Sequence, residues 1–166
     1  MENISLGKLY LKELKAEVPA SRKCLERITP ELFGWKPHEK SMNMGYLAIL
    51  VADMPRWITT MIEKTEIDFA TYEQLQAKSS TELVEHFDEN IKNAKNALQS
   101  VSEDVLSKTF YLKNQGQVLF NQRIDEAISS TLNHWVHHRG QLTVYMRLND
   151  IPVPSIYGPS ADEKTF

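Results

Sequence analysis

The sequence has one cysteine, no glycine-rich phosphate loop and no apolar run long enough to span a membrane. Because Cys24 has no partner in the chain, an intramolecular disulfide is excluded, and this cysteine usage fits a reducing compartment. The first 14 residues mix charged and apolar side chains and lack the apolar core of a secretory signal. We therefore expect a cytoplasmic protein with no membrane partner.

The sequence also lacks any block of like charge. Its 19 Lys and Arg residues nearly balance its 22 Asp and Glu residues, which gives a net charge of -3. A surface that binds nucleic acid normally carries a basic excess, so we expect no nucleic-acid partner. With 166 residues, of which 42% are hydrophobic, the chain is long enough to bury a core and is predicted to form a single domain over residues 1–166.

Apolar residues recur at intervals of three and four along four segments, which predicts four α-helices. Pro19 and Pro55 fall inside the first two segments and predict a kink or a break there. Three prolines after Asn149 predict an irregular tail over residues 149–166. The predicted fold class is therefore all-α, a single four-helix bundle. The expected helices cover residues 5–27, 43–62, 80–100 and 121–148.

Two connections between the predicted helices are long. Residues 63–79, between the second and third helices, exceed what adjacent antiparallel helices need, so this connection can cross the bundle. Residues 100–117 form a polar connection before the last helix, within which Thr109–Leu112 could be a short extended piece.

Three of the five histidines lie close together in the predicted last helix. His134 and His138 are four residues apart, so they lie on one face of the helix about one turn from each other. A neutral imidazole is the commonest transition-metal ligand, and this spacing allows two of them to share one ion. The same pattern is also typical of histidines that only pack at the rim of a core with satisfied hydrogen bonds. His137 is expected to point toward the polar side of the helix.

A metal site needs at least one further protein ligand. Asp53 on the second helix is the better candidate, although a solvent-facing carboxylate is the ordinary interpretation. His38, in the loop before the second helix, and His86, at the edge of the third, are expected to be surface groups. Cys24 is expected to be a small core residue, and no nucleophile elbow supports a Ser-His-Asp triad. The sequence therefore identifies no catalytic residue.

The last helix and the tail carry motifs that are more specific than the helical pattern. The His-Arg-Gly-Gln run at His138–Gln141 and the proline-containing tail that follows it resemble the DinB family of damage-inducible-type, YfiT-like bacterial proteins. The stretch around the start of the second helix resembles the same family. The segments that carry the resemblance are 33–42, 44–48, 133–142, 145–148 and 151–163.

The resemblance implies a four-helix bundle with up-down-down-up connectivity, which agrees with a long crossover between helices two and three. It also implies a homodimer and a divalent metal ion, often nickel or zinc, held by three histidines at one end of the bundle. Two of those ligands match His134 and His138, whereas the third falls at Leu50, which cannot bind a metal. Either the site is degenerate, or Asp53, His137, water or a substrate completes the coordination.

Several functions remain open at this point. The first is a DinB-like protein of unassigned activity with a weakened two-histidine site for a divalent metal. The second is a metal-dependent thiol S-transferase or hydrolase that acts on small molecules, with a small-molecule thiol as partner. The third is a metal-free binding or stress-response module, and the fourth is a dimeric bundle whose histidines only pack.

Overall fold

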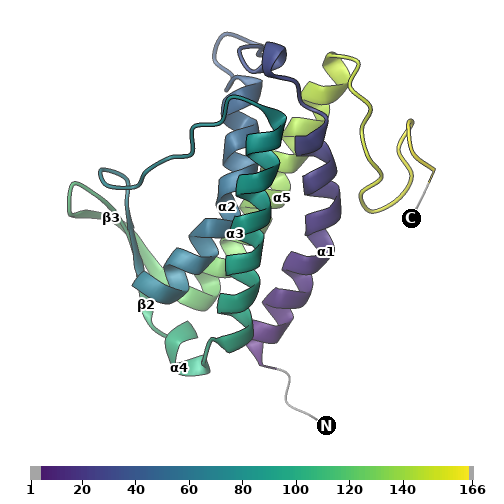
Figure 1. Ribbon diagram of the computed structural model, residues 1–166. Coiled ribbons are helices and arrows are strands. Elements are labelled where there is room, and N and C mark those ends of the chain that lie inside the picture. The colour runs from purple at the N-terminus through teal and green to yellow at the C-terminus, as the bar shows by residue number, and fades with distance from the viewer. Residues whose placement is uncertain (1–4, 165–166) are drawn as a thin grey trace.

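The computed structural model describes residues 5–164, in which long helices surround one hydrophobic core (Figure 1). Two short helical turns, η1 (Pro30–Leu32) and α4 (Glu103–Leu106), lie in the connections. Residues 1–4 and 165–166, which the single-domain prediction includes, lie outside the described residues. The four long helices are α1 (Leu6–Glu26), α2 (Met44–Lys64), α3 (Ser80–Ser100) and α5 (Ile124–Leu148).

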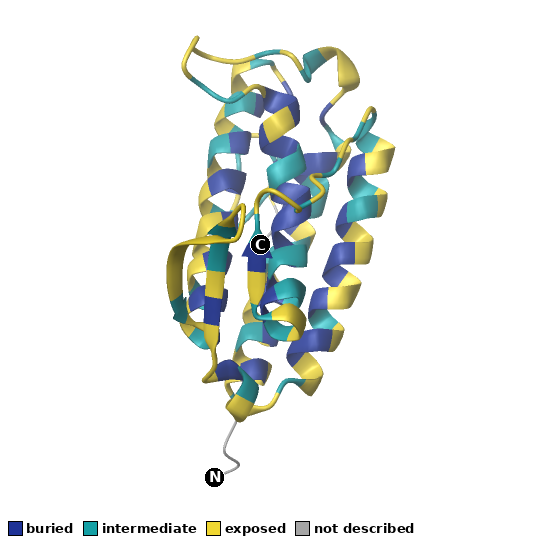
Figure 2. Cartoon of the chain, turned by 90° about the vertical axis from the view of Figure 1, so that its left-hand side faces the viewer, coloured by how far each residue is buried: buried dark blue, intermediate teal, exposed yellow. Residues whose placement is uncertain are grey.

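Each long helix packs on two neighbours, in the spatial order α1, α3, α2, α5. Figure 1 shows α1 and α5 running upward while α2 and α3 run downward, so residues 65–79 return the chain from the lower end of α2 to the upper end of α3. Buried residues recur along one face of each helix, as Figure 2 shows in dark blue. This is the pattern expected of amphipathic helices that share a core.

Local side-chain caps explain where two of the helices begin. The Asn43 side chain accepts a hydrogen bond from the backbone N–H of Tyr46 (2.7 Å) at the start of α2. Ser79 accepts one from the N–H of Glu82 (3.1 Å), and the carboxylate of Glu82 in the first turn of α3 also favours the helix dipole. The expected helix starts at residues 43 and 80 therefore agree closely with the structure.

The strictly all-α prediction is wrong, because the structure also contains a three-stranded sheet. Its strands are β1 (Glu66–Asp68), β2 (Thr109–Asn114) and β3 (Gln117–Arg123). β1 pairs with β2 in parallel, and β2 pairs with β3 in antiparallel fashion. Since residues 117–123 pair with β2, the last helix begins at Ile124 and not at residue 121 as expected.

A tight turn creates the β2–β3 hairpin. Gln115 and Gly116 both have positive φ angles, 51° and 76°, as a two-residue type I′ turn requires. Their backbone N–H groups donate to the carboxylate of Asp68 (3.0 and 2.7 Å), which ties the turn to the end of β1. In the sequence, the apolar pattern of the last helix extends back to residue 121, so the end of this strand was assigned to the helix.

Both helices with an internal proline continue through it, so no break occurs at Pro19 or Pro55. The lower end of α2 leans away from α3 toward the sheet (Figure 1). Proline has no N–H, so the carbonyl of Val51 loses its donor within the helix. The buried indole of Trp135 on α5 replaces it, with Nε1–H donating to the Val51 oxygen at 3.0 Å.

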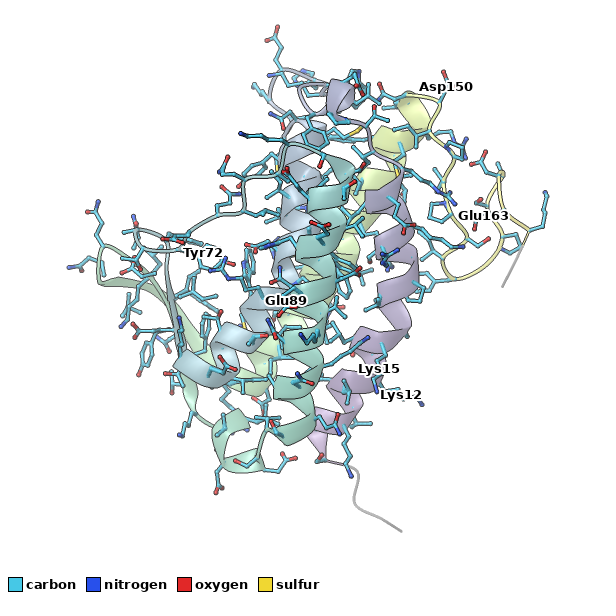
Figure 3. All side chains as sticks on the ribbon, viewed as in Figure 1. Lys12, Lys15, Tyr72, Glu89, Asp150 and Glu163 are labelled. Atoms are coloured by element: carbon cyan, nitrogen blue, oxygen red, sulfur yellow. The ribbon has the colours of Figure 1, made fainter. Side chains whose placement is uncertain are left out.

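The C-terminal tail is irregular in the described part and lies against α1. Glu163 forms an ion pair with Arg27, and Figure 3 shows its position in the tail beside α1. On α5, the guanidinium of Arg139 is 2% exposed, pairs with Glu17 at 2.5 Å and donates to the hydroxyl of Tyr157 at 2.8 Å. The buried Arg139 thus connects the last helix, the first helix and the tail.

Among residues 5–164, no helix is both long and apolar enough to cross a membrane. This finding agrees with the hydropathy of the sequence.

The proline-indole contact predicts a non-additive pair of mutations. Trp135→Phe should lower the free energy of unfolding by roughly 2–4 kcal/mol, because it leaves the Val51 carbonyl buried without a donor and opens a small cavity. Pro55→Ala restores the N–H within the helix, so in that background Trp135→Phe should cost about 1 kcal/mol less. Urea denaturation of the four proteins measures both costs. Equal costs in the two backgrounds would contradict this account of the contact.

Candidate functional site

The candidate site is a pocket of about 330 Å³ between α2, α5 and the connection that follows α2. Residues spaced four, three and four apart place one face of α2 along its wall. The connection contributes Phe69, Tyr72 and Gln74, and α5 contributes His134 and His138. The lining residues on α2 are Tyr46, Leu50, Asp53 and Trp57.

The two histidines of α5 converge in this pocket. Their Nε2 atoms are 2.8 Å apart and their ring centroids are 4.5 Å apart. His138 is only 7% exposed, whereas His134 lies at the exposed rim with its ring 5.9 Å from that of Trp57. The pair is therefore neither splayed apart nor buried out of reach of a ligand.

Gln141, one turn further along α5, orients the inner imidazole. Its Oε1 lies 2.7 Å from Nδ1 of His138, so Nδ1–H donates to the amide oxygen. This hydrogen bond fixes the tautomer and leaves a lone pair on Nε2 of His138, which then accepts from Nε2–H of His134. A hydrogen bond of this kind to the far nitrogen is the usual support of a metal-binding histidine.

The surroundings keep both imidazoles neutral. Burial lowers the pKa of His134, and the neighbouring His138 and His137 lower it further. Burial also lowers the pKa of His138, against the hydrogen bond to Gln141, which favours the protonated form. Because only a neutral imidazole has a lone pair to offer, these shifts favour the form that binds metals.

His137 does not join the pair. Its side chain is exposed, as the helical spacing predicted, and its ring lies edge-on to that of His138 with centroids 5.2 Å apart. His38 does not line the pocket either: it lies in an exposed loop, where its Nδ1 accepts from the backbone N–H of Lys40 at 3.1 Å. The geometry thus places neither residue among the pocket-lining groups.

Asp53 is 3% exposed, so the expectation of a solvent-facing carboxylate is wrong. It lines the same pocket as the histidine pair, but its oxygens already have partners in the protein. The hydroxyl of Tyr72 donates to Oδ2 at 2.6 Å, and Nε2 of His86 lies 3.2 Å from Oδ1. The guanidinium of Arg56 lies 3.7 Å from the same Oδ1. The expectation that His86 is only a surface group is wrong as well.

The contact with Asp53 fixes Tyr72 above the pocket. Burial and the adjacent carboxylate both raise the pKa of Tyr72, so its hydroxyl remains protonated and acts as a donor. The guanidinium of Arg56 stacks over the Tyr72 ring at 4.6 Å and donates to the backbone oxygen of Glu73 at 2.9 Å. Figure 3 shows Tyr72 in the connection beside α2. Together these contacts hold residues 69–74 over the site.

Leu50 is half-buried and lines the pocket with His134 and His138, so the position that lacks a ligand does face the pair. Within residues 5–164, no group of three or more His, Cys, Asp or Glu side chains lies close enough together to hold a metal ion. Cys24 is fully buried in the core, and burial raises the pKa of its thiol to about 11, so it is no nucleophile for this pocket. The protein thus offers two imidazoles as ligands.

Sequence reasoning missed two residues that shape the site. Gln141 follows His138 by three positions on a helix, a spacing at which side chains are neighbours, so its role was readable from the sequence. Tyr72 lies in a connection 19 residues from Asp53, and no local pattern indicates that they meet.

Comparison with known proteins gives concordant results. The model of the DinB family matches residues 1–165. The uncharacterized protein YrdA of Bacillus subtilis (strain 168) is 27% identical over 158 residues, which cover 93% of this chain and 89% of that protein.

Three solved structures share the fold. A DinB-like protein of Bacillus subtilis, YjoA, matches with a TM-score of 0.69 and 14% identity over 95% of this chain and 99% of its own. A DinB-like protein of Bacillus cereus ATCC 10987 matches with a TM-score of 0.65 and 19% identity, over 89% of this chain and 95% of its own. A putative DinB-family member of Exiguobacterium sibiricum 255-15 matches with a TM-score of 0.66 and 16% identity, over 92% of this chain and 97% of its own. At these identities the likeness concerns the fold alone, and with the family match over nearly the whole sequence it establishes that this chain belongs to the DinB family.

Proposed function

We propose that the pocket is a small-molecule site in which His134 and His138 together bind one divalent transition metal ion, zinc or nickel, with water or substrate as the remaining ligands. The observation that carries this proposal is the convergence of the two Nε2 atoms at 2.8 Å, with the inner ring oriented by Gln141. Both imidazoles have a lowered pKa and are therefore available in the neutral form.

The geometry of the pair suits such an ion. A zinc–nitrogen bond is about 2.0–2.1 Å long, so two ligands of one tetrahedral ion have nitrogens roughly 3.3 Å apart. The Nε2 atoms, at 2.8 Å, need to separate by only about half an ångström, which a small rotation of the exposed His134 ring supplies. The proton on Nε2 of His134 moves to Nδ1 of the same ring, so that both Nε2 atoms offer a lone pair to the ion. No backbone movement is required.

Because Leu50 stands where the resemblance to the family implies a third metal ligand, the site is weak and open. Its apolar side chain removes one bond and the preorganisation that a third imidazole would add. When bound, the metal ion would act as a Lewis acid toward a thiol, a water molecule or a carbonyl group. The protein's own contribution is to orient the ligand imidazoles through Gln141 and to present the Tyr72 hydroxyl, held by Asp53, at the pocket wall.

A metal-dependent transferase or hydrolase of small molecules, including thiols, is the reaction class that an open metal site supports best. The up-down-down-up connectivity of the bundle is supported by the path of residues 65–79 from one end of the molecule to the other (Figure 1).

A metal-free binding module is the second candidate function. It is favoured by a specific observation: without an ion, Nε2–H of His134 donates to Nε2 of His138, so the pair is already satisfied by its own hydrogen bond. Metal titration separates the two candidates.

Calorimetric titration of zinc into protein purified without a histidine tag should show one weak site per chain. Leu50→His should tighten this site by roughly tenfold or more, because it adds a further zinc–nitrogen bond. Ile49→His is the matched control: it adds an imidazole one position away, on a half-buried residue that does not line the pocket, and should leave the affinity unchanged. His138→Ala should abolish binding. No stoichiometric zinc in the wild type and in Leu50→His would end the metal proposal.

The lowered pKa values also predict how stability depends on pH. The imidazoles of His134 and His138 titrate near 6.5 when unfolded and at lower pH when folded, so below about pH 6.5 the unfolded state binds more protons. The free energy of unfolding of the metal-free protein should therefore fall between about pH 7.5 and 5.5. His138→Gln removes one of these groups and should make this fall smaller. Urea denaturation at the two pH values measures it, and an equal fall in the variant would refute the assignment to His138.

A further inference from the structure

A second pocket, of about 240 Å³, adjoins the histidine site and lies between the sheet and the lower halves of α2 and α5. Its wall is almost wholly apolar, and it contains no Asp, Glu, Lys or Arg side chain. Phe110, Leu112 and Phe120 come from the hairpin, Met61 from α2 and Ala127 from α5. A charged ligand group would lose its hydration there and meet no side chain of opposite charge, because the polar residues of the wall, Gln122, Ser130, Thr131 and His134, are uncharged.

The register of the sheet explains why one of its faces is apolar. Ile67, Leu112 and Phe120 are successive partners across β1, β2 and β3, so they form one row on the same face. Phe110 and Gln122 are partners two residues away and continue that face. All five residues line the second pocket, which therefore uses the inner face of the sheet.

The aromatic side chains at the mouth of this pocket are unusually exposed. Phe69 is 52% exposed and Phe120 is 49% exposed, although Phe110, on the same wall, is only 3% exposed. Clustered apolar side chains left in water are costly to a monomeric protein and usually mark a binding surface. The sheet thus holds apolar surface ready for a ligand.

The two pockets adjoin each other. Trp57, Phe69 and His134 line both of them, so a molecule at the histidine pair has the apolar pocket directly beside it. We propose that the ligand of this protein is an amphiphilic small molecule, with an uncharged alkyl or aryl tail under the sheet and a metal-binding head at His134 and His138. The position of the head depends on the proposed metal site, whereas the tail pocket stands without it.

The volume limits the size of the tail. At about 30 Å³ for each non-hydrogen atom, on the scale of a water molecule, a pocket of about 240 Å³ holds roughly eight such atoms. Each methylene group buried in it should raise the affinity about fourfold. A series of ligands that differ only in tail length should therefore gain affinity up to about eight carbons and then level off.

Straight-chain hydroxamates from acetohydroxamate to decanohydroxamate test this directly, because the head binds zinc and only the tail changes. Their affinities for the zinc-loaded protein are measured by calorimetry. We expect the stepwise gain in the wild type and its loss in Phe120→Asp, which places a charge in the tail pocket. Leu119→Asp is the matched control, since Leu119 is 58% exposed on the same strand and lines neither pocket. It should keep the stepwise gain.

In the hydroxamate series, either of two results would overturn the proposal: affinity that does not change with tail length, or a gain per methylene group that is the same in Phe120→Asp as in the wild type. Light scattering of the same variants provides a further test. If Phe120→Asp alone converts a dimer to a monomer, a second copy of the chain covers this face and the tail proposal fails.

Linear alcohols of the same lengths separate this inference from the metal site. They lack a chelating head and are titrated into metal-free protein while the indole N–H signal of Trp57 is followed by NMR. A length-dependent shift that Phe120→Asp removes supports the tail pocket even if no metal binds. The absence of any such shift overturns the tail pocket even if zinc binds to the histidines.

Discussion

The carbonyl of Val51 has no donor in its own helix because Pro55 lacks an N–H, and the indole of Trp135 supplies the hydrogen bond from α5. A second side-chain donor near the same proline, the amide of Asn90 on α3, donates to the carbonyl of Ala52 at 3.0 Å. Both contacts are buried, so each would be costly to lose. They fix the rotation and height of α5 and α3 against the middle of α2, and the rest of the site follows from that alignment.

Trp135 directly follows His134, so the contact that anchors α5 also sets where the histidine pair faces. On α2, Asp53 and Trp57 flank Pro55 and point into the pocket beside the pair. The lower end of α2 leans toward the sheet (Figure 1), and the apolar pocket lies there, next to the polar one. A single backbone defect thus organises a two-part cavity, with neutral imidazoles on one side and an uncharged wall on the other.

The positions of the histidine pair and of Leu50 could be predicted from the sequence, because they depend on the spacing of residues along a helix. The i, i+4 relation of His134 and His138 predicted a shared face, and the structure brings their Nε2 atoms together. The resemblance of the sequence to the DinB family implied that Leu50 stands where a ligand is expected, and this side chain does line the pocket. In both cases a helix translates sequence distance directly into spatial distance.

The features that the sequence did not reveal depend on distant partners. The hairpin requires a positive φ at Gln115, and glutamine is not a residue type that indicates this conformation. The last three residues of strand β3, 121–123, were expected to belong to the last helix. Asp53 was expected either in solvent or on a metal, but Tyr72 from the long connection occupies it. A side-chain contact between residues so far apart in the sequence depends on the whole fold, and no periodic pattern in the sequence predicts it.

The central claim is that two imidazoles of the last helix hold one metal ion. X-ray absorption spectroscopy of the zinc-loaded protein at one equivalent tests it most directly, because the imidazole rings give a distinctive outer-shell signal. The account predicts two imidazole nitrogens with oxygen ligands completing the coordination, and loss of the imidazole signal in His138→Gln, because one imidazole alone does not hold the ion. A spectrum with no imidazole or only one in the wild type, or an unchanged spectrum in the variant, would contradict it.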